Sequence, residues 1–204
     1  ASEFMKSAEV STPKPSKGAS KSKSGSATRD KLLSAAIQII ITQGIERLTL
    51  DAVAREAVVS KGGLLYHFPS KEALVAGVIS YLIDDFNVAI EKELEHPHTD
   101  NPSKDWLKAY VRASFNSSQP PLALIAGLFI AVTHNPELVE HARDGCAQWQ
   151  RHFDESGLDP VRAGIIRLAT EGLYPTEMFG VEPIQEPLRS QLKDAILELI
   201  DSSN

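Results

Sequence analysis

The stretch AREAVVSKGGLLYHFPSKEAL, residues 54–74, decides the fold of this chain. Its apolar spacing indicates a helix, yet two adjacent glycines, Gly62 and Gly63, interrupt the pattern. Ser60 can cap a helix at its start, and Pro69 forces the residue before it out of the helical region. The stretch therefore predicts a short helix between Ser60 and Pro69, in which each glycine costs about 1 kcal/mol of helix stability relative to alanine.

Helical spacing continues upstream of this stretch. Apolar residues recur between Arg29 and Gln43, with Thr28 as a possible N-cap and Gly44 as the C-terminal stop. The hydroxyl of Thr49 can cap a second helix of about two turns, over residues 50–57. Two short helices thus follow a longer one.

Downstream, Ser70 can cap a long helix that runs to Leu94. Caps, prolines and apolar stripes then divide the rest of the chain. Further helices are predicted over residues 104–117, 122–134, 136–155, 160–173 and 187–201. The chain is predicted to be all-α.

The composition of the chain indicates the cellular compartment in which it works. The chain has 204 residues, of which 42% are hydrophobic, enough for one or two cores. The single cysteine, Cys146, excludes an internal disulfide framework and fits a reducing compartment. The longest apolar run, Leu122 to Val132, falls short of the ~20 residues that cross a bilayer, and the N-terminus lacks the apolar region of a signal peptide. A cytoplasmic location is expected.

The first 27 residues form a distinct segment. Residues 1–4, before Met5, look like a cloning remnant, and residues 1–27 are predicted to be a disordered basic arm because they hold almost no large apolar side chain. Residues 1–29 carry six Lys/Arg against two Asp/Glu, whereas residues 76–204 carry ten against twenty. The arm could be a solubilising tail or could attract phosphates, and both readings stay open.

Two short helices after a longer one describe a helix-turn-helix unit, whose second short helix enters the DNA major groove. The segments LTLDAVAREA and VSKGGLLYHFPSKEAL resemble the DNA-binding domain of the TetR family of bacterial regulators, over Arg29 to about Val78. The resemblance implies a three-helix helix-turn-helix DNA-binding domain over residues 28–75. A larger helical ligand-binding and dimerisation domain is implied over residues 76–204. It also implies a dimeric transcriptional regulator, most often a repressor that a small-molecule effector releases from its DNA operator.

The resemblance assigns roles on and around the second short helix. Lys61 occupies a base-reading position and can donate to guanine, and Leu65 can meet a thymine methyl group. The two glycines leave room for phosphates, which other side chains are implied to hold. The residues expected to face double-stranded DNA are Thr49, Ser60, Lys61, Gly62, Gly63, Leu65, Tyr66, His67 and Lys71.

Two positions depart from the family pattern. Val58 stands where a glycine is usual, and a β-branched residue is uncomfortable in the left-handed backbone of such a turn. Gly63 stands where a Thr or Ser commonly touches phosphate, so that contact is missing. Phe68 is expected in the core.

The last two helices are implied to pair with those of a second subunit. A dimer would also place two recognition helices in successive major grooves about 34 Å apart. The interface residues expected are Ile165, Leu168, Ala169, Leu192, Ile196 and Leu199, although each also fits packing within one subunit.

An effector cavity is hypothesised among the aromatic residues of the larger domain, although each of them also fits an ordinary core. The candidates are Trp106, Tyr110, Phe115, Phe129, Trp149, Phe153, Met178 and Phe179. The acidic balance of this domain slightly favours a cationic effector.

An enzyme is not predicted. His134, His141 and His152 are seven and eleven residues apart, which places them two and three turns apart on a helix and too far for one metal ion. No nucleophile with a base and no phosphate-binding glycine loop is present in the sequence, and no cofactor or metal is expected. The remaining alternative is a DNA-binding architectural protein without an effector, which the basic arm favours slightly.

Overall fold

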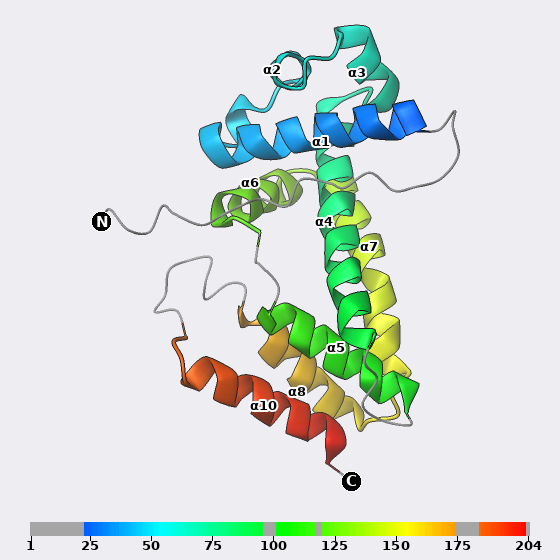
Figure 1. Cartoon of the computed structure of the whole chain (residues 1–204), viewed down its shortest axis with the longest axis vertical. Helices are drawn as coiled ribbons and strands as arrows, with labels where there is room; N and C mark the ends of the chain where they lie inside the picture. The colour runs from blue at the N-terminus through cyan, green and yellow to red at the C-terminus, as the bar shows by residue number, and fades with distance from the viewer. Residues whose placement is uncertain (1–22, 96–100, 117–119, 174–183, 203–204) are drawn as a thin grey trace. The chain divides into compact units, whose positions relative to one another are not determined.

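The computed structural model describes residues 23–95, 101–116, 120–173 and 184–202, and over these residues the regular structure is entirely helical (Figure 1). The prediction of an all-α chain is confirmed. The helices are α1 (Lys23–Gln43), the 3₁₀ helix η1 (Ile45–Arg47), α2 (Leu50–Glu56), α3 (Lys61–His67), α4 (Lys71–Leu94), α5 (Pro102–Asn116), α6 (Leu122–Thr133), α7 (Pro136–Asp154), α8 (Pro160–Glu171) and α10 (Leu188–Asp201).

The chain forms two compact units, and each unit is made of two separate stretches of the sequence. Unit 1 comprises Ala1–Tyr81 and Pro120–Ala142, and unit 2 comprises Leu82–Gln119 and Arg143–Asn204. Helices α4 and α7 contribute residues to both units. Unit 1 therefore takes in α6, which the sequence analysis places in the larger domain, because α6 packs against α1.

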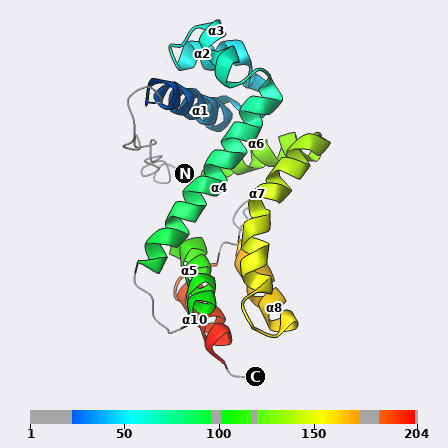
Figure 2. The ribbon, with the colours of Figure 1, turned by 90° about the vertical axis from the view of Figure 1, so that its right-hand side faces the viewer.

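Unit 1 has an aliphatic core built on α1. The helix buries side chains at the helical spacing that the sequence predicts, and α2 and α3 lie against it (Figure 2). Helix α6 also approaches it closely, since a Cβ on Gly127 would lie 2.9 Å from Cγ2 of Ile40. The buried residues of α1 are Leu32, Leu33, Ala35, Ala36, Ile37, Ile39 and Ile40.

Helix α1 begins earlier than predicted. It starts at Lys23, so Thr28 lies inside the helix rather than at its N-cap, and residues 23–27 are helical instead of part of a disordered arm. No proline interrupts this segment, although its two serines and Gly25 are weak helix formers. The guanidinium of Arg29, in the second turn of α1, lies 5.4 Å from the ring centre of Phe68. This contact holds the N-terminal part of α1 against the end of α3.

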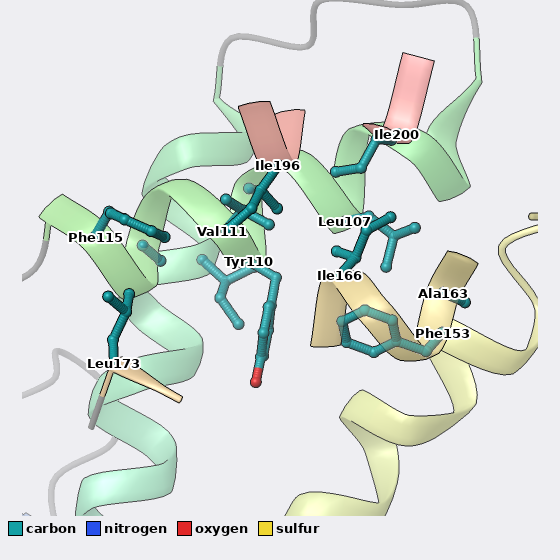
Figure 3. Close-up of a cluster of buried hydrophobic side chains, with 13 residues drawn as sticks. Leu107, Tyr110, Val111, Phe115, Phe153, Ala163, Ile166, Leu173, Ile196 and Ile200 are labelled. Carbon is teal, nitrogen blue, oxygen red and sulfur yellow. The ribbon is translucent and has the colours of Figure 1, made fainter. Parts of the chain in front are cut away.

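Unit 2 is built on α5, α8 and α10. Leu107 and Val111 of α5 face Ile196 and Ile200 of α10, with Ile166 of α8 beside them (Figure 3). All five side chains are at most 6% exposed. The residues that form the core of unit 2 thus come from segments far apart in the sequence.

A polar contact joins two of these helices. The ammonium of Lys108 on α5 lies 2.6 Å from the Asp201 carboxylate on α10, and the Lys108 side chain is 7% exposed. A charged group at this depth needs such a partner, because burying it alone would cost its hydration.

Helix α4 is more apolar than the sequence analysis recognised. Among the described residues it is the one helix long and apolar enough to cross a bilayer, with a mean hydropathy of 1.6, and the bent pair α6 and α7 would add a second if counted as one span. Its side chains Leu74, Val75 and Val78 are buried in unit 1. The core helices of globular proteins reach the same mean hydropathy, so the hydropathy of α4 does not by itself indicate a membrane span.

Candidate nucleic-acid interface and ligand cavity

Helix α3 is anchored by apolar residues on one side. Leu64 is fully buried and Phe68 is 3% exposed, which confirms the core position expected for Phe68. The Phe68 ring packs so closely on α4 that a Cβ at Gly77 would lie 2.6 Å from Cε1 of the ring. The backbone of α3 is thereby fixed on unit 1.

Side-chain caps set the starts of α2, α3 and α4, as predicted. The hydroxyl of Thr49 accepts from the Ala52 amide at 3.1 Å, and that of Ser60 accepts from the Gly63 amide at 3.1 Å. Ser70 caps α4 in the same way, through the Ala73 amide. Because a hydroxyl that accepts one bond can still donate another, Thr49 and Ser60 remain able to bind a phosphate oxygen.

The turn between α2 and α3 carries the strain expected at Val58. Val58 has φ of 54°, in the left-handed region, and is 92% exposed. The Val58 amide donates to the Arg55 carbonyl and the Val59 amide to the Ala54 carbonyl, which are the two bonds of a Schellman motif at the end of α2. The hydrogen bonds of this motif hold a β-branched residue where glycine is usual.

The outer face of α3 carries four of the predicted DNA-facing residues. Tyr66 is 84% exposed and Leu65 is 39% exposed, and the Lys61 side chain is 63% exposed. A Cβ at Gly62 would meet no atom within 4 Å, so this position leaves open space outside the helix. Another predicted residue of α3, His67, is partly buried, and its ring meets that of Tyr66 edge to face.

Gly63 has a different role from the one expected. A Cβ there would lie 3.0 Å from Cγ1 of Val59 and 3.2 Å from Oγ of Ser60. The position therefore faces the turn and not the open side of α3. The absence of a side chain at Gly63 lets the turn pack against the helix, whereas the space for an approaching partner lies at Gly62.

Two of the predicted cationic residues have partners within the chain. The Lys61 ammonium lies 3.0 Å from Oδ1 of Asp51, a residue that the sequence analysis did not single out. The Lys71 ammonium donates to the Ile45 carbonyl at 3.2 Å and so holds η1, which the sequence analysis did not predict. Only the folded structure shows these contacts, because they join residues on different elements.

The predicted subunit-interface residues divide into exposed and buried. On α8, Ile165 is 52% and Leu168 72% exposed, and on α10 Leu199 is 37% exposed. Ala169 is also exposed and Leu192 is partly buried. Ile196, at 6% exposed, packs in the core of its own unit, so it is corrected to a core residue.

Two further residues extend this apolar face. Val161 is 70% and Leu188 is 51% exposed. Val161 lies four and seven residues before Ile165 and Leu168, so the helical spacing of α8 could have revealed it. Leu188 lies at the start of α10, eleven residues before Leu199, and falls on the same stripe.

Four of the predicted effector-binding aromatics pack together in unit 2. Tyr110 stacks on Trp106 at 5.4 Å between ring centres and meets Trp149 and Phe153 edge to face. The ring of His152 also stacks on Trp106, at 3.9 Å. These rings form an aromatic cluster in which they contact one another, as core residues do.

The other predicted aromatic residues do not join this cluster. Phe115 is buried in unit 2 with the Arg189 guanidinium 5.5 Å from its ring centre. Phe129 belongs to unit 1 and is 57% exposed, so its assignment to the larger domain is corrected. The physical reason is that α6 buries its opposite face, through Leu124 and Leu128, on unit 1. Met178 and Phe179 lie outside the described residues.

A cavity of about 500 Å³ that is partly open to solvent lies in unit 2 between α7 and α8. Its lining residues are Gln150, Phe153, Asp154, Leu158, Pro160, Ala163, Gly164, Arg167, Leu168 and Glu171. Of the predicted aromatic residues, Phe153 contributes to it. The charged residues of the lining are not predicted from the sequence, because they lie at polar positions of helices otherwise interpreted as core or interface.

The charged groups at this cavity interact with one another. Arg167 donates to Oε1 of Glu171 at 2.7 Å, and the Tyr110 hydroxyl donates to the same oxygen at 3.5 Å. Burial, and then the negative charge of Glu171, raises the pKa of Tyr110 well above its ordinary value. The same two causes raise the pKa of Cys146, so that thiol stays protonated near neutral pH.

The histidines have separate partners. His134 bonds the Ile130 carbonyl and His141 lies between Ser80 and the Ala76 carbonyl, while His152 stacks on an aromatic ring. Within the part of the chain that the structure describes, no three His, Cys, Asp or Glu side chains gather to hold a metal ion.

Comparisons with known proteins match both parts of the chain. Residues 32–78 match the family described as bacterial regulatory proteins, tetR family, and residues 104–201 match the tetracyclin repressor-like C-terminal domain. The transcriptional regulator RutR of Escherichia coli K12 is 41% identical over 64 residues, which cover 31% of this chain and 30% of that relative. The chain thus matches less than half the length of this relative.

Solved structures share the fold. A putative TetR-family regulator from Rhodococcus sp. has a TM-score of 0.67 at 22% identity, over 86% of this chain and 99% of that one. The multidrug binding protein EbrR, solved with imidazole, has a TM-score of 0.63 at 20% identity, over 86% of this chain and 96% of that one. The same protein has also been solved with ethidium.

Proposed function

Because the chain belongs to the TetR family of bacterial transcriptional regulators, we propose that it is a dimeric repressor that reads a DNA operator through α3 and leaves it when a small molecule binds unit 2. Family membership supports a regulator with a helix-turn-helix DNA-binding domain and excludes an enzyme. A regulator of this kind works where the chromosome is, in the bacterial cytoplasm.

The observation that carries the proposal is the division of α3 into a buried side and an exposed side. Leu64 and Phe68 fix the helix on unit 1, while Lys61, Leu65 and Tyr66 point to solvent. A recognition helix needs both sides, because the helix must keep its position while its outer side chains reach into the major groove.

Each exposed residue fits one kind of DNA contact. Lys61 can donate to O6 and N7 of guanine, and Leu65 can contact a thymine methyl group. Tyr66, His67 and Thr49 can donate to phosphates and so set the orientation of α3. Lys71 and the first amides of α4 lie at a helix N-terminus and can add a further phosphate contact, with Lys71 exchanging the Ile45 carbonyl for the phosphate.

The exposed apolar stripe on α8 and α10 supports the dimer. Val161, Ile165 and Leu168 follow helical spacing on α8, and Leu188 and Leu199 lie on α10. Large exposed apolar side chains that adjoin one another are rare on a monomer surface and mark an interaction site. Two copies of the stripe would form a four-helix interface.

The cavity in unit 2 supports an effector. Its volume of about 500 Å³ lies within the range of small-molecule sites. Asp154 and Glu171 outnumber the one cation, Arg167, in its lining, so a cationic or aromatic amine suits it better than an anion. The imidazole and ethidium complexes of the structural neighbour EbrR agree with an effector of this class. An architectural protein without an effector would not need this cavity.

Fluorescence anisotropy with the intergenic DNA beside the chain's own gene tests operator reading. We expect Tyr66→Ala and Lys61→Ala each to weaken binding about tenfold, because Lys61→Ala removes a base contact of about 1–3 kcal/mol and Tyr66→Ala a hydrogen bond to a charged phosphate of about 1.5–3 kcal/mol. Lys92→Ala removes the same charge as Lys61→Ala from the far end of α4 and serves as the control. Equal binding of wild type to this DNA and to random duplexes would contradict operator reading at this locus.

Sedimentation velocity tests the dimer. We expect Leu168→Asp to shift the protein from dimer to monomer, because it places a charge in an apolar interface. Leu122→Asp on α6 introduces the same charge at a residue of 48% exposure outside the stripe and serves as the control. A wild-type protein that sediments as a monomer at micromolar concentration would contradict the proposed interface.

A further inference from the structure

Asp51 and Lys61 form an ion pair that links the starts of α2 and α3. The ammonium of Lys61 lies 3.0 Å from Oδ1 of Asp51, with 63% and 67% of the two side chains exposed. Lys61 is the first residue of α3, and Asp51 is the second residue of α2. The contact thus joins the first turn of α2 to Lys61, the residue assigned to guanine reading.

The fold does not depend on this pair. An ion pair with both partners so exposed contributes little to stability. Helix α3 is already held by the Ser60 cap and by the fully buried Leu64. The effect of the pair is instead to offset the positive charge of Lys61.

The position of Lys61 explains why a partner matters. A cation at a helix N-terminus opposes the helix dipole, and α3 has no acidic residue in its first turn. Asp51 supplies that negative charge from the neighbouring helix. The Asp51 carboxylate therefore holds the Lys61 ammonium beside α2. Its negative charge also weakens the attraction between that ammonium and a distant phosphate.

We propose that Asp51 is a specificity-determining residue. Because Asp51 competes with DNA for Lys61, the contribution of Lys61 to DNA affinity depends on the base that Lys61 meets. This inference rests on the proposed DNA reading by α3. On random DNA, phosphates must compete with Asp51 for Lys61, and the Asp51 carboxylate is repelled by the backbone. At the operator, the two acceptors of guanine replace Asp51 as the partner of Lys61. Asp51 thus weakens non-specific binding more than specific binding.

The test compares Asp51→Asn with wild type, using binding to the operator and to a random duplex of equal length over a potassium chloride series. For Asp51→Asn we expect random-DNA binding to tighten about tenfold and the slope of log affinity against log salt to steepen by about one per subunit, since one cation per subunit is released to phosphates. Operator affinity should change less than threefold, so the specificity ratio falls.

Control variants separate this role from others. Glu56→Gln makes the same charge change on α2 at an exposed residue, and should shift both affinities slightly and equally. Asp51→Glu keeps the charge and should restore the wild-type ratio. Asp51→Asn combined with Lys61→Ala should lose the steeper salt slope, because the released cation is then absent.

Three outcomes would overturn the proposal. An unchanged specificity ratio in Asp51→Asn, with both affinities equal to those of wild type, would show that the pair does not discriminate between sequences. Equal weakening on both duplexes would show a structural role, and selective loss of operator binding would show that Asp51 itself contacts a base. If wild type shows no operator preference, the proposed function fails at this locus, and an unchanged salt slope on random DNA in Asp51→Asn would then refute the role of Asp51 separately.

Discussion

Unit 1 and unit 2 organise their side chains in opposite ways. In unit 1, aliphatic residues such as Leu64 fill the core, and the polar or aromatic residues assigned to DNA lie outside it, with Tyr66 84% exposed. In unit 2, the buried Tyr110 packs against Trp149 and its hydroxyl reaches the exposed carboxylate of Glu171. On α3, Leu64 and Phe68 give support while Lys61, Leu65 and Tyr66 are assigned to recognition, whereas in unit 2 the proposed recognition and the packing fall on overlapping residues.

This contrast predicts that single substitutions separate stability from binding in unit 1. Leu64→Ala should lower the free energy of unfolding by about 2–5 kcal/mol, because it leaves a cavity beneath α3. Tyr66→Ala, two residues away, should change stability by no more than about 0.5 kcal/mol and lower only DNA affinity. Denaturant unfolding followed by circular dichroism measures the difference. Similar losses of stability in the two variants would break the contrast.

A pair of glycine substitutions compares the packing of the two units. Gly77→Ala in unit 1 should lower the free energy of unfolding by about 1–2 kcal/mol, since the new Cβ would lie 2.6 Å from Cε1 of the buried Phe68 ring. Gly164→Ala in α8 meets no atom within 4 Å and should raise stability by about 0.5–1 kcal/mol through helix propensity. Thermal unfolding of both variants tests this. Stabilisation by Gly77→Ala would show that the support of α3 is looser than described.

The strained turn between α2 and α3 predicts a stabilising change. Val58 has φ of 54°, and a left-handed backbone is unfavourable for a β-branched residue but not for glycine. Val58→Gly should raise the free energy of unfolding by about 1 kcal/mol, less the added entropy of the unfolded chain. Val88→Gly, at an exposed residue inside α4, is the matched control and should destabilise. A loss of stability in Val58→Gly would mean that the valine side chain contributes contacts that outweigh the strain.

The smallest effect expected concerns pH and unit 2. Burial against Trp106 lowers the pKa of His152 below its ordinary value of 6.5. The unfolded chain then binds the proton more readily, so the stability that neutral His152 provides is present above pH 6.5 and is lost as pH falls through the lowered pKa of the folded state. His152→Phe keeps a stacked ring and should make unfolding free energy flatter between pH 7 and 5. An unchanged pH dependence would show that His152 does not titrate against the aromatic cluster.

The sequence predicted unit 1 well because its signals are local. The caps Thr49, Ser60 and Ser70, and the strain at Val58, depend on residues within a few positions of one another. The start of α1 was missed because serines recur at residues 20, 22, 24 and 26, so no single capping residue stands out in the sequence. The ion pair of Asp51 with Lys61 was missed because it joins residues ten positions apart on separate helices.

Unit 2 was predicted less completely, because its packing joins segments that are far apart in the sequence. Helical spacing identified its helices, but apolar residues at helical spacing face either the core or a partner, and spacing alone does not distinguish Ile196 from Leu199. Aromatic residues raised the same ambiguity, since Phe129 is exposed in unit 1 and Phe153 lines the cavity. Packing between distant segments decides these roles.

The central claim is that Lys61 reads guanine in the major groove from the start of α3. The direct measurement is operator binding with 7-deazaguanine, which lacks the N7 acceptor, in place of the guanine where substitution weakens wild-type binding most. Wild type should lose about tenfold in affinity for this duplex. Lys61→Ala should bind the altered and unaltered operators equally. An equal loss in wild type and Lys61→Ala, or no loss at any guanine, would contradict the claim.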